Sequence, residues 1–229
     1  MRKWLIIPII LLAVFFASDK TRADYKGILL GESDLYQTLQ LHSGDLLKEI
    51  VVLPETLNYN HNDAKEIIFR LDQLPQSILQ KTAQHHIKII LFTGKLTDND
   101  SVSYLQGQVP RGYTEPVVWD NIPGIGGSEF VYVKIGHSER GKGHGSVNLE
   151  YHEFAHSLMN LVYNDTIVSS EINNLWSLEA ESIFPGNAYF LKYKEEYFAE
   201  CFAYYFFSPE TRSILQQKAP KTYEFFNKL

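Results

Sequence analysis

The 229 residues of this chain suit one domain, or two small lobes that share a cleft. Hydrophobic residues make up 45% of the sequence and charged residues 21%, with 14 Tyr and 14 Phe, which excludes disorder, collagen and coiled coil. One cysteine excludes an internal disulfide framework and a cysteine-based zinc site. The formal net charge is -6, although the first 23 residues carry four basic side chains and only one acidic one. The remainder is therefore more acidic still, and we expect it to bind no nucleic acid and no anionic membrane.

Residues 1–23 are predicted to be a secretory signal peptide. Two basic residues follow Met1, and an apolar run then extends from Trp4 to Ala17, broken only by Pro8. This run has the length of the apolar core of a signal peptide and falls short of the roughly 20 residues that span a membrane. We therefore expect a secreted, extracellular protein without stable membrane association after cleavage. The cleavage site is left open, and an uncleaved membrane anchor is the alternative.

Residues 24–146 are predicted to form a small lobe around a β-sheet. Three runs rich in β-branched or aromatic residues, bounded by polar residues or proline, indicate strands at Glu49–Leu53, Ile87–Phe92 and Glu129–Ile135. Between the first two, Asn62 and Asp63 offer an N-cap for a helix with apolar residues at helical spacing. A further short helix is predicted to begin at Pro75, and the stretch 109–128, rich in Pro and Gly, is predicted to be mostly loop.

Residues 147–229 are predicted to be helical, with a break at Phe184–Asn187. Strands thus come first and helices second, which indicates an α+β fold rather than alternating α/β. We expect a domain over residues 24–229 in which a sheet lobe and a helical lobe flank an active-site cleft.

The segment from Val147 to Leu158 contains the motif H-E-x-x-H, formed by His152, Glu153 and His156. On a helix the two histidines lie one turn apart on one face, so both imidazoles can reach a single metal ion. Glu153 lies beside them, where it could accept a proton from metal-bound water. The alternative is a helix with two solvated histidines.

A catalytic zinc site needs a third protein ligand and one open position. Glu195, Glu196 and Glu200 lie in one predicted helix, with Glu196 and Glu200 one turn apart and away from its core face. Stacked carboxylates on an otherwise aromatic helix are costly to bury unless a metal or an imidazole N–H compensates for them. Spacing alone leaves open which glutamate binds the metal, and a solvated acidic face is the alternative. The core face of that helix is predicted to consist of Phe198, Cys201, Phe202 and Tyr205.

Several blocks of the sequence resemble the secreted Pro-Pro endopeptidases of Gram-positive bacteria and, more distantly, the catalytic domain of anthrax lethal factor. The likeness extends in order over most of residues 47–229. The blocks that carry it are Gly94–Asp98, Trp119–Ser128, Gly141–His144, Asn148–Glu153, Glu196–Phe202 and Lys218–Phe226.

The resemblance implies a zincin-like metalloprotease that binds one zinc ion through His152, His156 and Glu196. It implies that Glu153 is the general base and that Glu200 supports a ligand histidine instead of the metal. It also matches Tyr189 to a tyrosine whose hydroxyl group faces the active site.

The substrate is predicted to be an extended peptide in the cleft. Gly126, Gly127 and Ser128, just before a strand, indicate an exposed edge where a peptide could add, and the resemblance matches Trp119 to an aromatic residue of the family's substrate cleft. Glu195 is included among the substrate-binding candidates. Val117 stands where the family pattern has a lysine, so Glu195 is expected to lack its usual partner.

These observations predict a secreted zinc endopeptidase that cuts between two prolines in proline-rich segments of bacterial surface or extracellular proteins. One alternative is a toxin-like protease that acts on a host protein, as lethal factor does. Another is a binding module that keeps the fold without zinc.

Overall fold

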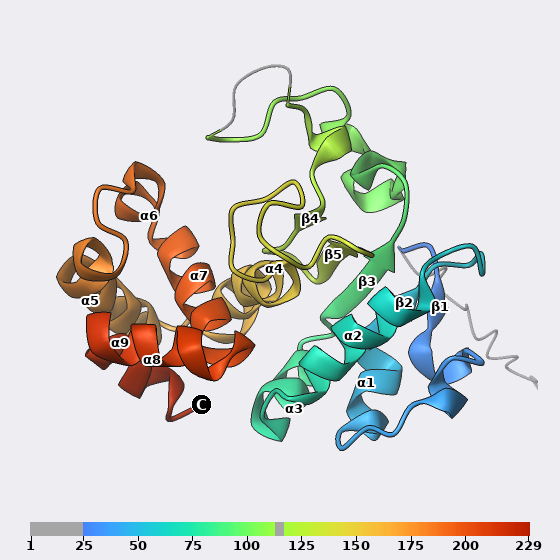
Figure 1. Ribbon diagram of the computed structural model, residues 1–229, viewed down its shortest axis with the longest axis horizontal. Coiled ribbons are helices and arrows are strands. Elements are labelled where there is room, and N and C mark those ends of the chain that lie inside the picture. Colours follow the sequence, from blue (N-terminus) through green and yellow to red (C-terminus); the bar gives the residue numbers. More distant parts are fainter. Residues whose placement is uncertain (1–24, 113–116) are drawn as a thin grey trace, which may run out of the picture.

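The computed structural model of the chain describes residues 25–112 and 117–229, and Figure 1 shows its arrangement. The predicted signal peptide lies outside the described residues. A five-stranded sheet with the first three helices lies on one side, and the helices after α4 lie on the other (Figure 1). The strands are β1 (Ile28–Leu29), β2 (Val51–Leu53), β3 (Lys88–Phe92), β4 (Gly124–Ile125) and β5 (Phe130–Lys134). The helices are α1 (Gly44–Ile50), α2 (His61–Asp72), α3 (Gln76–Gln84), α4 (Leu149–Ser157), α5 (Thr166–Ile183), α6 (Ala188–Lys192), α7 (Lys194–Phe207), α8 (Pro209–Lys218) and α9 (Pro220–Phe226).

The strand order in the sheet is β1-β2-β3-β5-β4. The three middle strands are parallel, with Val51 opposite Ile89 and Ile89 opposite Val131, and the outer strands β1 and β4 are antiparallel to their neighbours. Helices α2 and α3 form the crossover between β2 and β3, as parallel pairing requires. Strand β4 thus forms one edge of the sheet, close to α4.

The predicted strands at 87–92 and 129–135 are confirmed as β3 and β5, each slightly shorter than expected. The strand expected at Glu49–Leu53 is wrong in its first half, because Glu49 and Ile50 complete α1 and only the last three residues are extended. The predicted cap of α2 is also wrong. Asn60 is the N-cap, and its side-chain oxygen accepts hydrogen bonds from the backbone N–H groups of Asn62 and Asp63, at 3.0 and 3.3 Å.

Alternating side chains divide the sheet between two cores, because successive residues of a strand point to opposite faces. On one face, Ile89 and Val131 join the main core, which continues through α4 into the helical part of the chain. On the other face, Val52, Ile90 and Tyr132 join a smaller core covered by residues 96–105 and 117–125. The smaller core supports the edge of the sheet that borders the cleft.

The helical part is built around α7, which packs against α4. The four residues predicted for the core face of α7, Phe198, Cys201, Phe202 and Tyr205, are all buried. The predicted break separates α5 from α6, as expected. Within the described ranges, no helix is both long enough and apolar enough to cross a membrane.

Candidate active site and metal centre

Helix α4 presents the H-E-x-x-H motif to α7. Its N-cap is Asn148, whose side-chain oxygen accepts a hydrogen bond from the backbone N–H of Tyr151 at 3.0 Å. Phe154 faces the main core and is fully buried, so the opposite flank of the helix is free for the two histidines. This local geometry follows directly from the spacing of polar and apolar residues.

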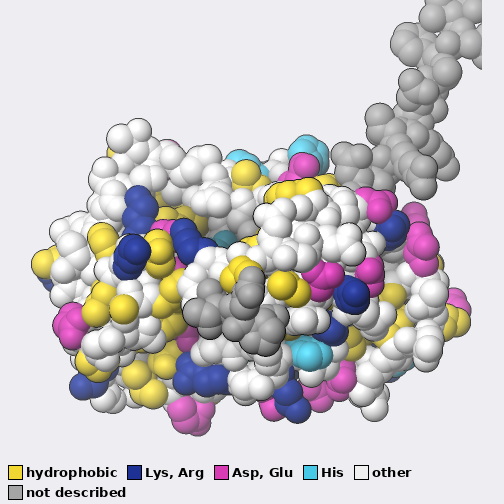
Figure 2. Space-filling view, turned by 90° about the horizontal axis from the view of Figure 1, so that it is seen from above, with side chains coloured by type: hydrophobic (Ala, Val, Ile, Leu, Met, Phe, Trp, Pro, Cys, Tyr) yellow, Lys and Arg dark blue, Asp and Glu magenta, His cyan; other side chains and the backbone are white. Residues whose placement is uncertain are grey.

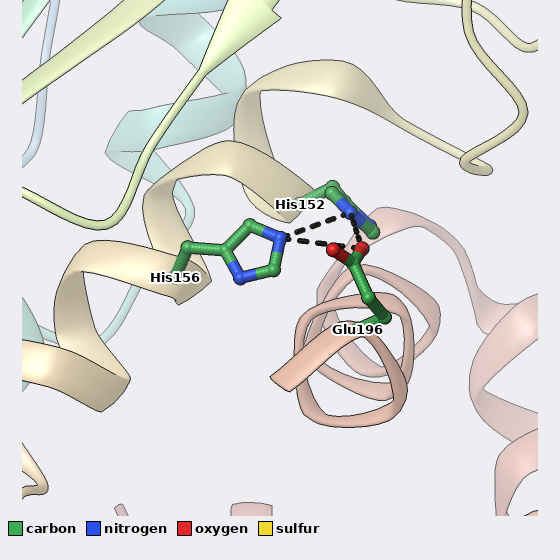
Figure 3. Close-up of side chains that lie close together, drawn as sticks. All are labelled: His152, His156 and Glu196. Carbon is green, nitrogen blue, oxygen red and sulfur yellow. Dashed lines mark hydrogen bonds and ion pairs between the residues drawn. The ribbon is translucent and has the colours of Figure 1, made fainter. Parts of the chain in front are cut away.

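The side chains of His152, His156 and Glu196 converge at one point between α4 and α7 (Figure 3). The Nε2 atoms of the two histidines are 3.3 Å apart. Glu196 Oε2 lies 3.3 Å from His152 Nε2 and 3.5 Å from His156 Nε2. One donor atom from each residue thus lies within 4.8 Å of the other two. The structure therefore brings Glu196, of the three glutamates that spacing left open, to the two rings.

Glu200 holds His152 from the side away from this point. Its Oε2 accepts a hydrogen bond from His152 Nδ1 at 3.0 Å, which leaves Nε2 directed at Glu196 and His156. Its Oε1 accepts hydrogen bonds from Arg140 at 3.1 Å and from the backbone N–H of Val147 at 3.0 Å. A fully buried carboxylate is thereby fully hydrogen-bonded and fixes the orientation of the ring, as carboxylates beside metal-binding histidines commonly do.

The electrostatics of the cluster favour a positive charge at its centre. Burial alone would lower the pKa of His152, but its hydrogen bonds to Glu196 and Glu200 raise that pKa to about 10. Burial would raise the pKa of Glu196, yet its bonds to His152 and His156 hold that pKa far below its usual range. The carboxylates therefore stabilise a cation between the rings, whether it is a proton or a metal ion.

The donor set fits zinc. Two imidazole nitrogens and one carboxylate oxygen are the protein ligands of many catalytic zinc sites, which keep a fourth position for water or substrate. Here the point where the three side chains converge borders a cavity of about 860 Å³, which all three residues line and which leaves room for a fourth ligand. His144 is not part of the cluster, because its ring bonds to Ser146 and to the carbonyl oxygen of His137. His85 and His86 are exposed and also lie outside the cluster.

Glu153 lies at the wall of the same cavity, next to β4. A Cβ atom at Gly124 would come within 2.9 Å of Glu153 Cγ, so the glycine allows the carboxylate to lie against the edge strand. Burial raises the pKa of Glu153, while His152 and His156 act in the opposite direction. The position and the raised pKa suit a carboxylate that exchanges protons with groups in the cavity.

Tyr189 and Arg111 both reach Glu196 from the cavity side. The Tyr189 hydroxyl, in α6, donates a hydrogen bond to Glu196 Oε1 at 2.7 Å, and Arg111 Nη2 donates to the same oxygen at 3.2 Å. Arg111 also donates to Glu195 Oε1 at 2.9 Å and lies 4.0 Å from the centre of the Tyr193 ring. Glu196 thus offers one oxygen to the histidines while its other oxygen is held in place.

The predicted substrate-binding residues divide between two cavities. Trp119, Gly126, Gly127 and Glu195 line the large cavity, whereas Ser128 lies beyond its end and lines a smaller one. On the left of Figure 2, where the helical part lies, Lys and Arg side chains gather beside hydrophobic ones. The paired strand at the edge is Gly124–Ile125, two residues earlier than the edge expected at 126–128.

The two glycines that follow β4 are packed on α4. A Cβ atom at Gly126 would lie 1.8 Å from the carbonyl oxygen of Glu153, so this position has no room for a side chain. Gly127 has φ of +99° and donates its N–H to Ser157 Oγ at 2.9 Å. The glycines therefore set the distance between the sheet edge and the helix that carries His152 and His156.

Comparisons with known proteins show the family to which the chain belongs. The family model of the anthrax toxin lethal factor, N- and C-terminal domain, matches residues 37–229. The chain belongs to this family. It is 42% identical over 187 residues to a Pro-Pro endopeptidase of Clostridioides difficile (strain 630), a match that covers 81% of this chain and 83% of that one. It is 41% identical over 185 residues to a Pro-Pro endopeptidase of Paenibacillus alvei, with 80% and 84% covered.

The solved structure of the Pro-Pro endopeptidase from Paenibacillus alvei matches this fold with a TM-score of 0.74 and 41% identity, over 80% of this chain and 98% of that one. The predicted zincin-like α+β fold is thereby confirmed, and the chain is a metalloendopeptidase of the lethal factor family. The roles of individual residues and the boundaries of the two lobes remain predictions.

Within this family pattern, Glu195 has a partner that the sequence did not reveal. Because Val117 replaces the family's lysine, Glu195 was predicted to lack an ion-pair partner. In the structure, Arg111 forms an ion pair with Glu195. Arg111 lies in a stretch rich in Pro and Gly and 84 residues away in sequence, so no local pattern indicates the contact. The hydrogen bond from Arg140 to Glu200 was not predicted either, because it also joins residues far apart in the sequence.

Proposed function

We propose that the chain is a secreted, zinc-dependent endopeptidase that hydrolyses the bond between two prolines in proline-rich segments of extracellular proteins. The convergence of His152, His156 and Glu196 on one point is the observation that carries the proposal. The named activity of the two relatives supports the Pro-Pro preference. The basic start and apolar run of residues 1–23 support secretion.

One zinc ion, held by His152, His156 and Glu196, supplies Lewis-acid chemistry, since bound zinc acidifies water and polarises a carbonyl group. The remaining tasks fall to side chains of this protein. Glu200 keeps the ring of His152 in the orientation that exposes Nε2.

Glu153 acts as the general base and then as the general acid. Its carboxylate accepts a proton from the attacking water and returns it to the nitrogen of the leaving proline, which is a secondary amine and must be protonated to depart. A raised pKa suits both halves of this role, because the protonated carboxyl must survive until the C–N bond breaks.

Tyr189 donates a hydrogen bond to the oxyanion that develops on the attacked carbonyl. Its hydroxyl now donates to Glu196 Oε1 and lines the cavity, so a small rotation brings it to a substrate beside the metal site. Burial and the neighbouring Glu196 raise the pKa of Tyr189, which keeps the phenol protonated and able to donate.

The cleft suits a peptide that cannot form backbone hydrogen bonds to a β-strand along its whole length. Proline has no N–H group and favours polyproline II, so a Pro-Pro segment is recognised by shape and aromatic contact rather than by a continuous ladder. Trp119 offers such a contact in the cavity, and the edge strand β4 offers backbone groups to the residues that flank the prolines.

A library of peptides with a central Pro-Pro pair, incubated with the zinc-loaded enzyme, tests the proposal. We expect cleavage between the prolines, its loss with a chelator and its recovery with zinc. Cleavage confined to peptides without the pair would refute the specificity, and cleavage confined to host-cell proteins would favour a toxin. N-terminal sequencing of the protein from culture medium tests secretion, and we expect a start near residue 24.

A further inference from the structure

A second cavity, of about 420 Å³, continues the large cavity beyond the end of β4. Both cavities are bordered by Ile125, Gly126 and Gly127, so one stretch of sheet edge leads from the metal site into the second cavity. Its other walls come from residues 101–104, part of a short 3₁₀ helix over Asp100–Leu105, and from Ser128–Phe130.

The second cavity has a mixed lining, in which Val102, Ile125 and Phe130 supply the apolar surface and two serines and Glu129 the polar groups. Val102 and Phe130 belong to the surface of the smaller core, and Tyr104 projects beside them with 69% of its area exposed. The hydroxyl of Ser101, one of the lining residues, is hydrogen-bonded to the Tyr132 hydroxyl at 2.7 Å. No Lys or Arg is among the described residues that line the cavity, and Glu129 is its one charged residue.

The direction of the edge strand indicates which part of a substrate reaches this cavity. Gly124 lies against Glu153, which marks the position of the scissile bond, and the chain then runs through Gly127 toward Ser128. Antiparallel strand pairs are the more common kind, and β4 already pairs with β5 in this way. A peptide antiparallel to β4 runs the opposite way, so its residues before the scissile bond lie toward Ser128.

Resting on the proposed function, we propose that the second cavity is a binding subsite for an apolar side chain of the substrate on the N-terminal side of the scissile bond. An extended chain advances about 3.3 Å per residue, and Ser128 follows Gly124 by four residues, after which the chain turns back into β5. The side chain bound there is therefore roughly the fourth residue before the scissile bond. Tyr104, which lines the cavity, offers it an aromatic contact.

If this subsite exists, extending the peptide on the N-terminal side of the scissile bond raises kcat/KM, and extending it on the C-terminal side does not. Three peptides test it with the zinc-loaded enzyme: a short peptide of three residues on each side of the scissile Pro-Pro bond, and that peptide extended by three residues at its N-terminus or at its C-terminus. With Phe or Leu in the fourth position, the N-terminal extension is expected to raise kcat/KM about ten-fold, as partial burial of an apolar side chain would. Asp in that position is expected to remove the gain.

Tyr104→Ala is expected to remove the gain from the N-terminal extension and to leave cleavage of the short peptide unchanged. Ile167→Ala is the matched control, because Ile167 is 80% exposed on α5, away from the cavity. Equal rates for the short and N-terminally extended peptides, or a gain confined to the C-terminal extension, would overturn the subsite while the proposed function stands. Failure to cut the short peptide at its Pro-Pro bond would refute the proposed function itself.

Discussion

The metal centre and the wall that faces the substrate are positioned by different means. The metal centre lies between two packed helices, and Glu196 and Glu200 are buried and multiply hydrogen-bonded. The opposite wall consists of a two-residue edge strand, a pair of glycines and a loop side chain, Arg111, that is half exposed. Helix packing thus positions the proposed metal ligands, whereas close backbone approach and one surface ion pair shape the proposed peptide-binding wall.

The largest effect is expected where the chemistry takes place. Glu153→Gln removes the proton acceptor and keeps the size of the side chain, so we expect kcat to fall by about 10³-fold or more with the zinc content unchanged. Turnover against a Pro-Pro peptide, together with metal analysis, checks this. Glu55→Gln, an exposed change elsewhere, is the control. Near-normal turnover with zinc retained would mean that Glu153 is not the base.

A smaller effect is expected from Glu200, which holds the ring of the proposed ligand His152. In Glu200→Gln only one oxygen remains to accept the bonds now made by His152, Arg140 and Val147, so the imidazole is held less firmly. We expect zinc affinity to fall about 10- to 100-fold. Competition with a chromophoric chelator measures this affinity, and exposed Glu210 on α8 supplies the control Glu210→Gln. Unchanged affinity would limit Glu200 to a structural role.

Two features of the metal centre could be predicted from the sequence, because they are local. The pair His152 and His156 follows from the period of one helix, and the buried face of α7 from the spacing of its apolar residues. The choice of Glu196 over Glu195 and Glu200 could not be predicted from spacing, because it depends on how α7 crosses α4. The family resemblance indicated Glu196, and in the structure Glu196 is the glutamate that lies beside both histidine rings.

The wall formed by β4, the two glycines and Arg111 was harder to predict from the sequence than the metal centre. Strands β1 and β4 have two residues each, too few for an alternating pattern, and they exist only because neighbouring strands pair with them. The pair Arg111–Glu195 joins segments far apart in the sequence. The fixed distance between β4 and α4 rests on Gly126, whose role becomes visible only when both elements are in place.

Gly126→Ala tests the glycine that sets this distance. Because the added Cβ would overlap the carbonyl oxygen of Glu153, β4 or α4 must shift, at a cost of about 1–3 kcal/mol in the free energy of unfolding. Urea denaturation measures the loss, and kcat/KM is expected to fall with it. Gly145→Ala, where a Cβ meets no atom within 4 Å, is the control. Equal stability of the two variants would show that Gly126 is not in such close contact with the backbone of α4.

The smallest effect is expected at the surface ion pair. Arg111→Ala is expected to raise KM less than ten-fold, because Arg111 and Glu195 are partly exposed and such pairs contribute about 0.2–1 kcal/mol. Although Arg111 also donates to Glu196 Oε1, Tyr189 still donates to that oxygen, so kcat is expected to change little. In a Glu195→Gln background the same substitution is expected to have less effect. Additive effects of the two substitutions on KM would mean that the pair does not act as a unit.

The central claim is that one metal ion lies between α4 and α7. A crystal structure of the zinc-loaded protein, with anomalous scattering measured at the zinc edge, tests it most directly. We expect a single strong peak at about 2.0–2.2 Å from His152 Nε2, His156 Nε2 and one carboxylate oxygen of Glu196. A peak bound by Glu195 or Glu200 in place of Glu196, or no peak at this point, would contradict the account.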